Sequence, residues 1–411
     1  MQSHDGAPRK VLIFSLAYYP NHVGGAEVAI KEITDRVDPN DIEFHLVTNH
    51  FDTTLPREER IGNVLVHRVG LGTRGATVSD THHSLFYLAK ILYVPFALCA
   101  YIRLHRTYRF NGAWAMMSYM VYPIVLARLF GIRPPYVLTL QEGDPFRHVF
   151  KRWYIRPFST LLTTGYRNAT VIQTISTYLK AWALEREVKC PVEVIPNGVD
   201  MAHFTQPYTP EELDSVRTLL GKQEGDVFLI TTSRLVHKNG VDDCIRALTY
   251  VPMHVHFAVL GIGPDKEMLR ALASELGVSD RVHFVGHVNH PDMPKYLQAC
   301  DIFIRPSRSE GMGNSFIEAM AAGVPVIATQ EGGIRDFLFD AKKNPDMSPT
   351  GWAVAKDSPH DIADVVRDIL AHPEKVAEVA AHARAFVIAR YDWDRIVQSM
   401  RTRVFSHLFS R

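Results

Sequence analysis

Cysteine is scarce in this sequence, which contains four in 411 residues, at positions 99, 190, 244 and 300. None of the four belongs to a C-x-x-C pair, so the sequence predicts neither a disulfide framework nor a zinc ribbon. The 20 histidines are scattered and also lack the spacing of a metal site. We therefore expect a protein without a structural metal, in a reducing compartment such as the cytoplasm.

Long apolar runs are lacking as well. The nearest candidate for an 18-residue run, residues 85–102, contains Lys90 and Pro95. The first ten residues carry several charges and Pro8 where a signal peptide would have an apolar segment. The sequence thus predicts neither a transmembrane helix nor a signal peptide.

The sequence has little net charge, with 45 basic against 44 acidic side chains, which argues against a nucleic-acid binder. Apolar residues make up 46% and charged residues 22%, the balance of a chain that fills cores and is not disordered. At roughly 150 residues per domain, the length predicts two or three domains.

Charge is unevenly distributed along the chain. Residues 82–190 hold 14 basic and 4 acidic side chains, interleaved with aromatic residues such as Phe96, Tyr101, Phe110, Phe150 and Phe158. Basic and large apolar side chains together suit an anionic membrane surface or an acidic lipid headgroup. A solvated basic face over an ordinary core explains the same composition, so both interpretations stay open at this point.

Segments of strand and helix type alternate through the whole chain, which predicts an α/β fold. Strands are expected at 11–16, 44–48, 64–69, 113–116, 136–140, 170–174, 192–195, 227–231, 255–260, 282–285, 302–304 and 324–328. Helices are expected at 26–37, 241–248, 265–276, 293–299 and 315–322, with a last helix at 395–409.

The turn Pro196-Asn197-Gly198 divides this pattern into two halves. We expect a Rossmann-like domain at 1–198 and a second one at 199–391, with residues 392–411 as a terminal segment. Two doubly wound halves place ligands at a cleft faced by the carboxyl ends of both sheets.

The segment 310–318, E-G-M-G-N-S-F-I-E, follows a predicted strand and opens a helix. Small residues let the backbone approach a ligand, and free N–H groups at a helix start favour phosphate. Glu310 in the loop and Glu318 one turn inside the helix can both accept hydrogen bonds from sugar hydroxyls. Two glutamates alone would be read as a helix-capping acid and a solvated side chain; the glycines and the preceding strand favour a ligand site.

Two cations follow the first strand of the second half. Arg234 and Lys238 lie four residues apart in one loop, where they would converge on a diphosphate leaving group and stabilise the charge that develops there. Two surface cations without function are the alternative.

Taken together and in order, the segments 24–27, 196–200, 261–264, 310–318 and 332–333 with the Arg234/Lys238 pair resemble the retaining glycosyltransferases of family 4, which have the GT-B architecture. The resemblance implies that the first domain binds the acceptor and the second the donor, a nucleotide-diphosphate sugar that serves as co-substrate. It also implies that the last helix crosses back to the first domain. No cofactor or metal is expected, because the two cations take over the work of a divalent ion.

Roles carry over from the family to matching positions. Glu310 would contact the donor sugar and Arg234 with Lys238 the diphosphate. The family usually places a histidine after the strand that ends here at Leu140; this chain has Gln141, which exchanges hydrogen bonds but cannot titrate. The expected donor-binding positions are Gly24, Gly25, Gly261, Gly263, Gly311, Met312, Gly313, Asn314, Ser315 and Glu318.

The expectation is therefore a hexosyltransferase that reacts by front-side displacement on a glycan or lipid-linked acceptor, in the cytoplasm or at the cytoplasmic face of a membrane. A nucleotide-sugar epimerase of the same architecture is one alternative, and it would act on the donor alone. A glycoside phosphorylase would need a longer chain with pyridoxal phosphate. A non-catalytic protein that binds nucleotide sugars is the last alternative, and it would turn over no donor.

Overall fold

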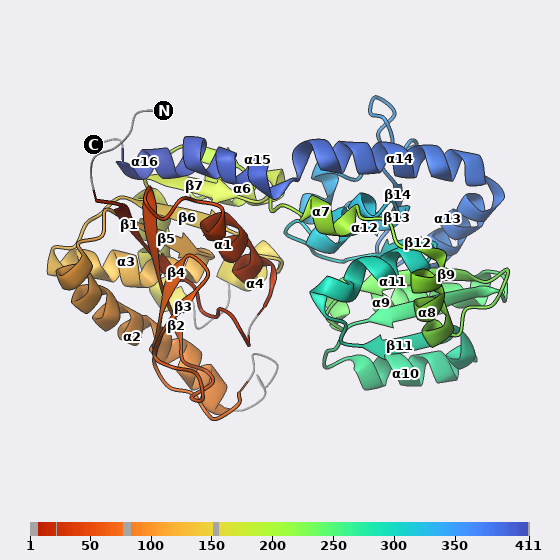
Figure 1. Ribbon diagram of the computed structural model, residues 1–411, viewed down its shortest axis with the longest axis horizontal. Helices are drawn as coiled ribbons and strands as arrows, with labels where there is room; N and C mark the ends of the chain where they lie inside the picture. Colours follow the sequence, from red (N-terminus) through yellow and green to blue (C-terminus); the bar gives the residue numbers. More distant parts are fainter. Residues whose placement is uncertain (1–6, 22, 77–83, 151–155, 410–411) are drawn as a thin grey trace. The chain divides into compact units, whose positions relative to one another are not determined.

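The computed structural model describes residues 7–21, 23–76, 84–150 and 156–409. Contacts within the chain divide it into two compact units (Figure 1). Unit 1 comprises Met1–Asn197 with Trp393–Arg411, and unit 2 comprises Gly198–Asp392. Each junction lies one residue from the boundary expected from the sequence.

Unit 1 is built on an eight-stranded sheet in the order β3-β4-β2-β1-β5-β6-β7-β8. Only the β3–β4 pair is antiparallel among the described strands of this sheet. The strands are β1 (Arg9–Phe14), β2 (Ile42–Asn49), β3 (Glu58–Ile61), β4 (Val64–Val69), β5 (Gly112–Met116), β6 (Tyr136–Leu140), β7 (Val171–Thr174) and β8 (Val192–Val194). Strand β1 is fully buried from Val11 onward, which its continuous apolar run predicts for a central parallel strand.

The helices of unit 1 connect these strands. They are α1 (Gly25–Asp35), α2 (Ser84–Tyr108), α3 (Val121–Ala127), α4 (Phe146–Phe150), α5 (Ser159–Arg167), α6 (Thr177–Leu184), α15 (Trp393–Met400) and α16 (Ser406–Phe409), with a π-helical segment, Arg401–Phe405, joining the last two. This C-terminal segment packs on the core of unit 1, where Phe405 meets Trp114 edge to face at 5.3 Å. The return of the last helix to the first domain is thus confirmed.

Unit 2 carries six parallel strands in the order β11-β10-β9-β12-β13-β14. The strands are β9 (Val227–Thr232), β10 (Val255–Leu260), β11 (Val282–Gly286), β12 (Ile302–Arg305), β13 (Val326–Thr329) and β14 (Trp352–Val354). Strand order reverses between β9 and β12, the place where doubly wound sheets bind ligands outside the carboxyl ends of their strands.

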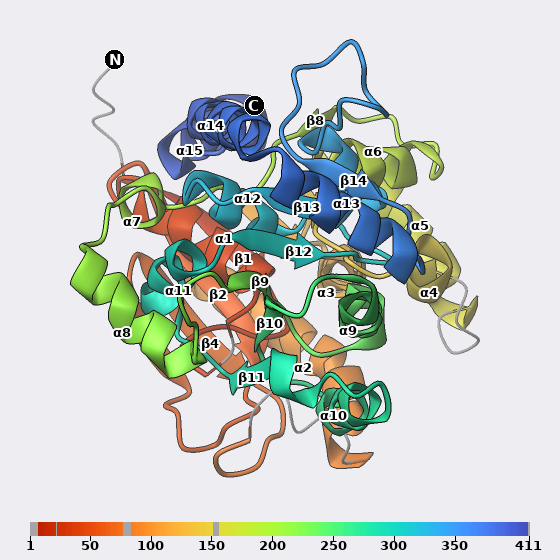
Figure 2. The ribbon, with the colours of Figure 1, turned by 90° about the vertical axis from the view of Figure 1, so that its right-hand side faces the viewer.

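Helices cover both faces of the unit 2 sheet (Figure 2). They are α7 (Met201–Phe204), α8 (Pro210–Leu220), α9 (Val241–Ala247), α10 (Lys266–Glu275), α11 (Met293–Ala299), α12 (Asn314–Ala321), α13 (Pro359–Ala371) and α14 (Pro373–Arg390). Helices α9, α10 and α13 bury apolar residues against β9 and β10 in one core. The two-domain α/β fold expected from the sequence is confirmed.

Helix α2 corrects one expectation. It runs without interruption through Lys90 and Pro95, the residues expected to break the apolar run. By length and composition its segment Leu88–Tyr108, with a mean hydropathy of 1.3, could cross a membrane. One face of α2 is buried in unit 1, where the hydroxyl of Tyr93 donates to the carbonyl of Val47 at 2.9 Å.

Candidate functional site

The reversal of strand order in unit 2 brings together the two loops that carry the predicted donor residues. One loop follows β9 and continues into a 3-10 turn, His237–Asn239. The other follows β12 and leads into α12. Because β9 and β12 are neighbours and parallel, both loops emerge at the same edge of the sheet.

The first loop holds both predicted cations, and its backbone is anchored on both sides. The side-chain amide of the buried Asn239 donates to the carbonyl of Arg234 at 2.6 Å. The carbonyl of Lys238 accepts the backbone N–H of Arg308 at 2.7 Å. Arg234 is exposed and Lys238 half-buried, so both side chains reach the surface of unit 2. The loop therefore presents two positive charges from a fixed backbone.

Glu310 is held by a buried arginine at the end of β12. Arg305 is 6% exposed, and its guanidinium donates to Glu310 Oε2 at 2.8 Å, to Ser315 Oγ at 2.7 Å and to the carbonyl of Thr232 at 3.3 Å. It also stacks over the ring of Phe316, 4.2 Å from the centroid. Burial lowers the pKa of Arg305 from its ordinary value, an effect that Glu310 and Glu318 oppose. Such charge-assisted hydrogen bonds orient the Glu310 carboxylate.

Glu318 lies in α12 and meets a histidine from another element. His290, in the 3-10 segment His290–Asp292, places its Nε2 3.1 Å from Glu318 Oε1. The ring of His290 also packs edge to face on Phe204 of α7 at 5.3 Å. One carboxylate oxygen of Glu318 thus contacts His290, while the side chain stays accessible, at 16% exposure.

At two of the predicted donor-binding glycines, the backbone conformation and the close packing leave no room for a side chain. Gly313, immediately before α12, has φ +92°, and a Cβ there would lie 2.5 Å from Phe316. Gly261 has φ +146°, and a Cβ would lie 1.9 Å from the carbonyl oxygen of Ser233. The segment Gly261–Gly263 therefore packs directly on the loop that carries Arg234, so these glycines support that loop as well as leaving room for a ligand.

The remaining predicted residues of the α12 motif differ in their surroundings. The N–H of Gly311 donates to Glu310 Oε1 at 3.1 Å, and Ser315 already receives a hydrogen bond from Arg305. Met312 is 2% exposed, so its side chain belongs to the core. Asn314 is half-buried at the first position of α12.

Sequence reasoning missed several polar groups at this edge. Within the part of the chain that the structure describes, the hydroxyls of Thr231 and Ser233 at the end of β9 are buried without a hydrogen-bond partner. Buried hydroxyls are ordinarily satisfied, so these two are candidates for ligand contacts. Arg305 was also missed, although an arginine ending the apolar run I-F-I is itself a signal, because unpaired arginines are almost never buried.

A cavity of about 730 Å³ opens in unit 2 between α8, β11 and α11. Its lining includes His287, Val288 and Asn289, the residues that connect β11 to the segment carrying His290. The cavity therefore borders on the element that contacts Glu318.

In unit 1, Gly24 and Gly25 lie at the start of α1, after β1. The N–H of Gly24 donates to the Glu27 carboxylate at 2.9 Å, which closes the first turn of the helix. Gln141, directly after β6, exchanges two hydrogen bonds with the side chain of Asn197, at 3.0 and 3.2 Å. Each amide group acts as donor and acceptor in this pair, so the two side chains fix each other's orientation.

Next to Gln141 lies a buried carboxyl group that the sequence did not single out. Glu142 is 4% exposed and accepts hydrogen bonds from the N–H of Ser118, at 2.7 Å, and from its hydroxyl. Burial raises the pKa of Glu142, while the bonds from Ser118 oppose that rise. Because Ser118 follows Met117, whose φ is +75°, the carboxylate stabilises an unfavourable backbone turn after β5.

Among the described residues, no group of three or more His, Cys, Asp or Glu side chains is arranged to hold a metal ion. This observation concerns only 7–21, 23–76, 84–150 and 156–409.

Comparison with known proteins gives two family models that match consecutive parts of the chain. The model described as "Glycosyltransferase Family 4" matches residues 23–203. The model described as "Glycosyl transferases group 1" matches residues 214–386. The first range lies mainly in unit 1 and the second lies entirely in unit 2.

One curated relative is the "GDP-mannose-dependent monoacylated alpha-(1-6)-phosphatidylinositol monomannoside mannosyltransferase" of Corynebacterium glutamicum, 32% identical over 235 residues. The alignment covers 54% of this chain and spans 59% of the relative's length.

Two solved structures are similar over the whole chain. Sucrose-phosphate synthase from Thermosynechococcus elongatus has a TM-score of 0.81 at 18% identity, covering 98% of this chain and 99% of that one. Anabaena Alr3699/HepE in complex with UDP and glucose has a TM-score of 0.75 at 20% identity, covering 97% and 100%. At these identities the likeness concerns the fold.

Proposed function

Because the chain belongs to the glycosyltransferases of group 1 and family 4, we propose that it moves a hexose from a nucleotide-diphosphate sugar to a glycan or lipid-linked acceptor. One observation carries the proposal. Two carboxylates, Glu310 and Glu318, and two cations, Arg234 and Lys238, belong to the loops and helix at the carboxyl ends of β9 and β12. This is the combination that a diphosphate with hydroxyl-rich groups at both ends requires.

In the proposed reaction the donor lies on unit 2. Glu310, oriented by Arg305, accepts hydrogen bonds from the sugar, and Glu318 accepts them from the ribose. The bond between the anomeric carbon and the β-phosphate oxygen breaks, and Arg234 and Lys238 stabilise the negative charge left on the diphosphate. The acceptor hydroxyl attacks from the same face, its proton passes to the leaving phosphate oxygen, and the configuration is retained. Two cations at this position supply the charge that a metal would otherwise supply.

The cavity between α8, β11 and α11 is the proposed place of the nucleotide base, because it borders on the element that contacts Glu318. The mannosyltransferase relative uses GDP-mannose according to its name, and HepE was solved with UDP and glucose. GDP-mannose and UDP-glucose are therefore the first donors to test.

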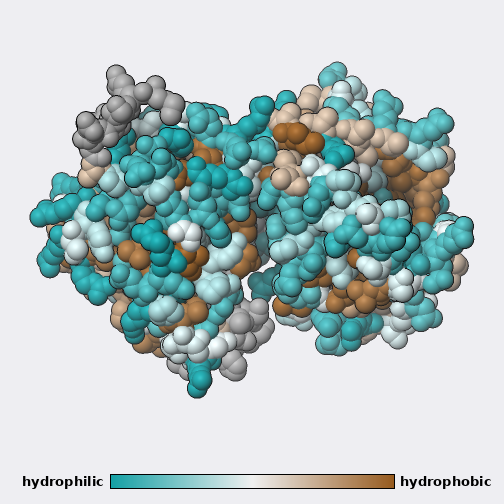
Figure 3. Space-filling view, viewed as in Figure 1, coloured by the Kyte–Doolittle hydropathy of each residue, from teal (hydrophilic) through white to brown (hydrophobic). Residues whose placement is uncertain are grey.

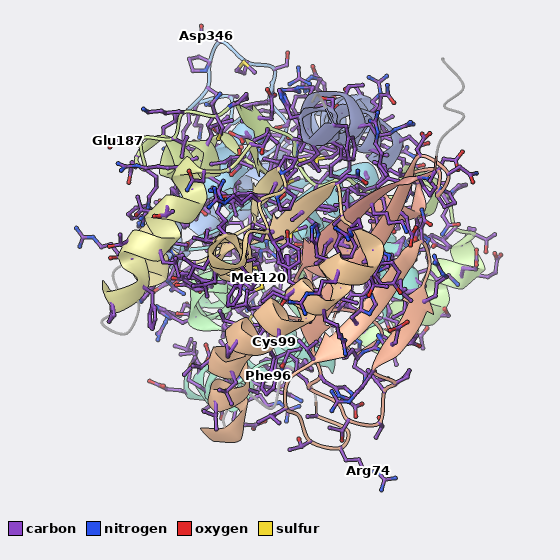
Figure 4. All side chains as sticks on the ribbon, turned by 90° about the vertical axis from the view of Figure 1, so that its left-hand side faces the viewer. Arg74, Phe96, Cys99, Met120, Glu187 and Asp346 are labelled. Atoms are coloured by element: carbon purple, nitrogen blue, oxygen red, sulfur yellow. The ribbon has the colours of Figure 1, made fainter. Side chains whose placement is uncertain are left out.

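Unit 1 is the proposed acceptor-binding part, and it offers an apolar and basic surface to a membrane. Its exposed apolar residues include Leu88, Ile91, Phe96, Leu129, Phe130 and Phe158. Figure 3 shows apolar patches where α2 lies in Figure 1, and Figure 4 labels Phe96 and Cys99 on this helix. Arg103 and Arg106 are exposed near the end of α2, and the exposed Arg109 directly follows this helix. We propose that this surface rests on an anionic membrane; because the other face of α2 is buried in unit 1, the helix lies on the membrane and does not cross it.

The structure corrects in part the expectation that the basic and aromatic residues of the segment 82–190 form a membrane surface. Tyr101, Phe110 and Phe150 are buried in the core, whereas Phe96 and Phe158 are exposed. Residues 82, 83 and 151–155 of this segment lie outside the described part of the chain. The membrane surface is therefore smaller than composition suggested.

The donor is tested by thermal shift and by transfer assays with a panel of GDP-, UDP- and ADP-sugars. We expect one nucleotide to raise the melting temperature, and the matching sugar to be consumed only when an acceptor is supplied. Glu318→Ala should abolish the shift, because the ribose contact is lost. Conversion of the donor without acceptor would indicate an epimerase instead, and the absence of any response to all donors would refute the proposal.

The membrane surface is tested by vesicle co-sedimentation. Arg103→Gln/Arg106→Gln/Arg109→Gln should weaken binding to vesicles with anionic lipid by about 1 kcal/mol per arginine. A matched control is Arg246→Gln/Arg270→Gln/Arg367→Gln, which removes three exposed arginines from unit 2 and should bind as the unmodified protein does. Equal binding by both triple variants would contradict the proposal.

A further inference from the structure

Arg308, in the loop between β12 and α12, is hydrogen-bonded through its whole guanidinium group. Its Nε donates to Asp357 Oδ1 at 2.5 Å, and its Nη1 to the carbonyl of His237 at 2.6 Å. It binds Asp242 with both terminal nitrogens, at 2.8 and 3.0 Å, and Nη2 also donates to Asp243 at 2.8 Å. A guanidinium has five N–H groups, and these five hydrogen bonds use all of them.

The partners of Arg308 come from three places in the fold. Asp242 and Asp243 lie in the first turn of α9, Asp357 lies between β14 and α13, and His237 begins the 3-10 turn that carries Lys238. In addition, the backbone N–H of Arg308 donates to the carbonyl of Lys238 at 2.7 Å. Arg308 therefore holds the Lys238 turn at two consecutive carbonyl groups.

This arrangement costs free energy at two residues, through the carboxylate of Asp243 and through the backbone of Asp357. Burial and the adjacent Asp242 raise the pKa of Asp243 to about 6, against its pairing with Arg308. Asp357 has φ +56°, a left-handed conformation that is unfavourable for a residue with a Cβ. Strained or crowded groups of this kind persist where the surrounding contacts over-determine them, often at functional sites.

We propose that Arg308 is a positioning residue that fixes the Lys238 turn so that Lys238 meets the diphosphate of the donor, an inference that rests on the proposed function. Because every N–H of its guanidinium is occupied by protein, Arg308 does not bind the phosphates itself. Its charge is balanced by three carboxylates, so its contribution is geometric. Holding a catalytic group in place before the ligand arrives lowers the entropic cost of binding and reaction.

The test compares the affinity of the protein for a nucleoside diphosphate with that for the corresponding nucleoside monophosphate, by isothermal titration calorimetry. Arg308→Lys keeps the charge but loses the fork of hydrogen bonds. We expect this variant to bind the diphosphate about tenfold more weakly and the monophosphate within about twofold of the unmodified protein. The kcat for transfer should fall by a similar factor. Arg367→Lys is the matched control, since Arg367 also joins a carboxylate to a backbone carbonyl, far from Lys238 in sequence, on α13.

A second variant separates positioning from stability. Asp357→Gly removes one partner of Arg308 and at the same time relieves the left-handed backbone, so its melting temperature should stay within about 2 °C. Diphosphate affinity should nevertheless fall about threefold. Two results would overturn the inference: an equal loss of diphosphate and monophosphate binding, or unchanged binding of both ligands in the two variants. The proposed function is measured separately, by the donor specificity of the unmodified protein.

Discussion

Lys238→Ala is expected to lower kcat for sugar transfer about 100- to 1,000-fold, because it removes a positive charge from the place where charge develops on the departing diphosphate. The turn that carries Lys238 is fixed through its backbone by Arg308, so the substitution should delete the side chain without moving the loop. The same substitution at Arg234, whose carbonyl is held by Asn239, should have an effect of similar size. The measurement is steady-state transfer with the donor identified by the panel.

The control for these variants is Lys375→Ala, which removes an exposed lysine from α14. It should retain full kcat. The melting temperature of Lys238→Ala should lie close to that of the unmodified protein, since Lys238 is half-buried in a surface loop. A kcat within threefold of the unmodified value for both cation variants would contradict the assignment of Arg234 and Lys238 to the leaving group.

Most of the fold follows from local patterns in the sequence. Mainly apolar runs such as Val255–Leu260, which only His256 interrupts, predict buried parallel strands, and the structure has this strand at the same bounds. Two strands were missed for a physical reason. β3, E-E-R-I, is an exposed antiparallel edge strand, and β14 has only three residues, so neither carries a periodic signal. Their pairing is decided by neighbours distant in sequence.

The candidate site likewise has a part that local sequence motifs predict and a part that they do not. Glycines, glutamates and cations at fixed spacing locate the loops after β9 and β12, because each motif is local. The partners of these residues are not local: Arg308 meets Asp242 and Asp357, 66 and 49 residues away, and His290 meets Glu318 across 28 residues. Such pairs depend on which strands become neighbours, and a single sequence contains no signal for that. For the same reason, the burial of Tyr101, on the inner face of α2, could not be inferred from a basic, aromatic composition.

Arg305→Met should be the most damaging single substitution to the stability of unit 2, lowering the free energy of unfolding by about 3 kcal/mol or more. Methionine fills much of the volume beside Phe316, but it leaves Glu310 without its cation and Ser315 and the Thr232 carbonyl without their donor. Breaking a buried ion pair from one side costs this much because the other charge stays desolvated. Chemical denaturation followed by circular dichroism measures the change, and Arg367→Met, in an exposed pair on α13, should stay within about 0.5 kcal/mol.

The double variant Arg305→Met/Glu310→Gln decides whether the pair serves stability or function. Removing the charge of Glu310 as well should restore part of the lost stability, about 1–2 kcal/mol, because no buried charge is then left unpaired. Sugar transfer should not recover, since the neutral amide accepts weaker hydrogen bonds from the sugar than an oriented carboxylate does. Recovery of both stability and transfer would mean that Glu310 only balances Arg305. Recovery of stability alone would mean that the buried arginine is retained to hold Glu310 toward the donor. The free energy lost by burying the charge of Arg305 would then serve function and not stability.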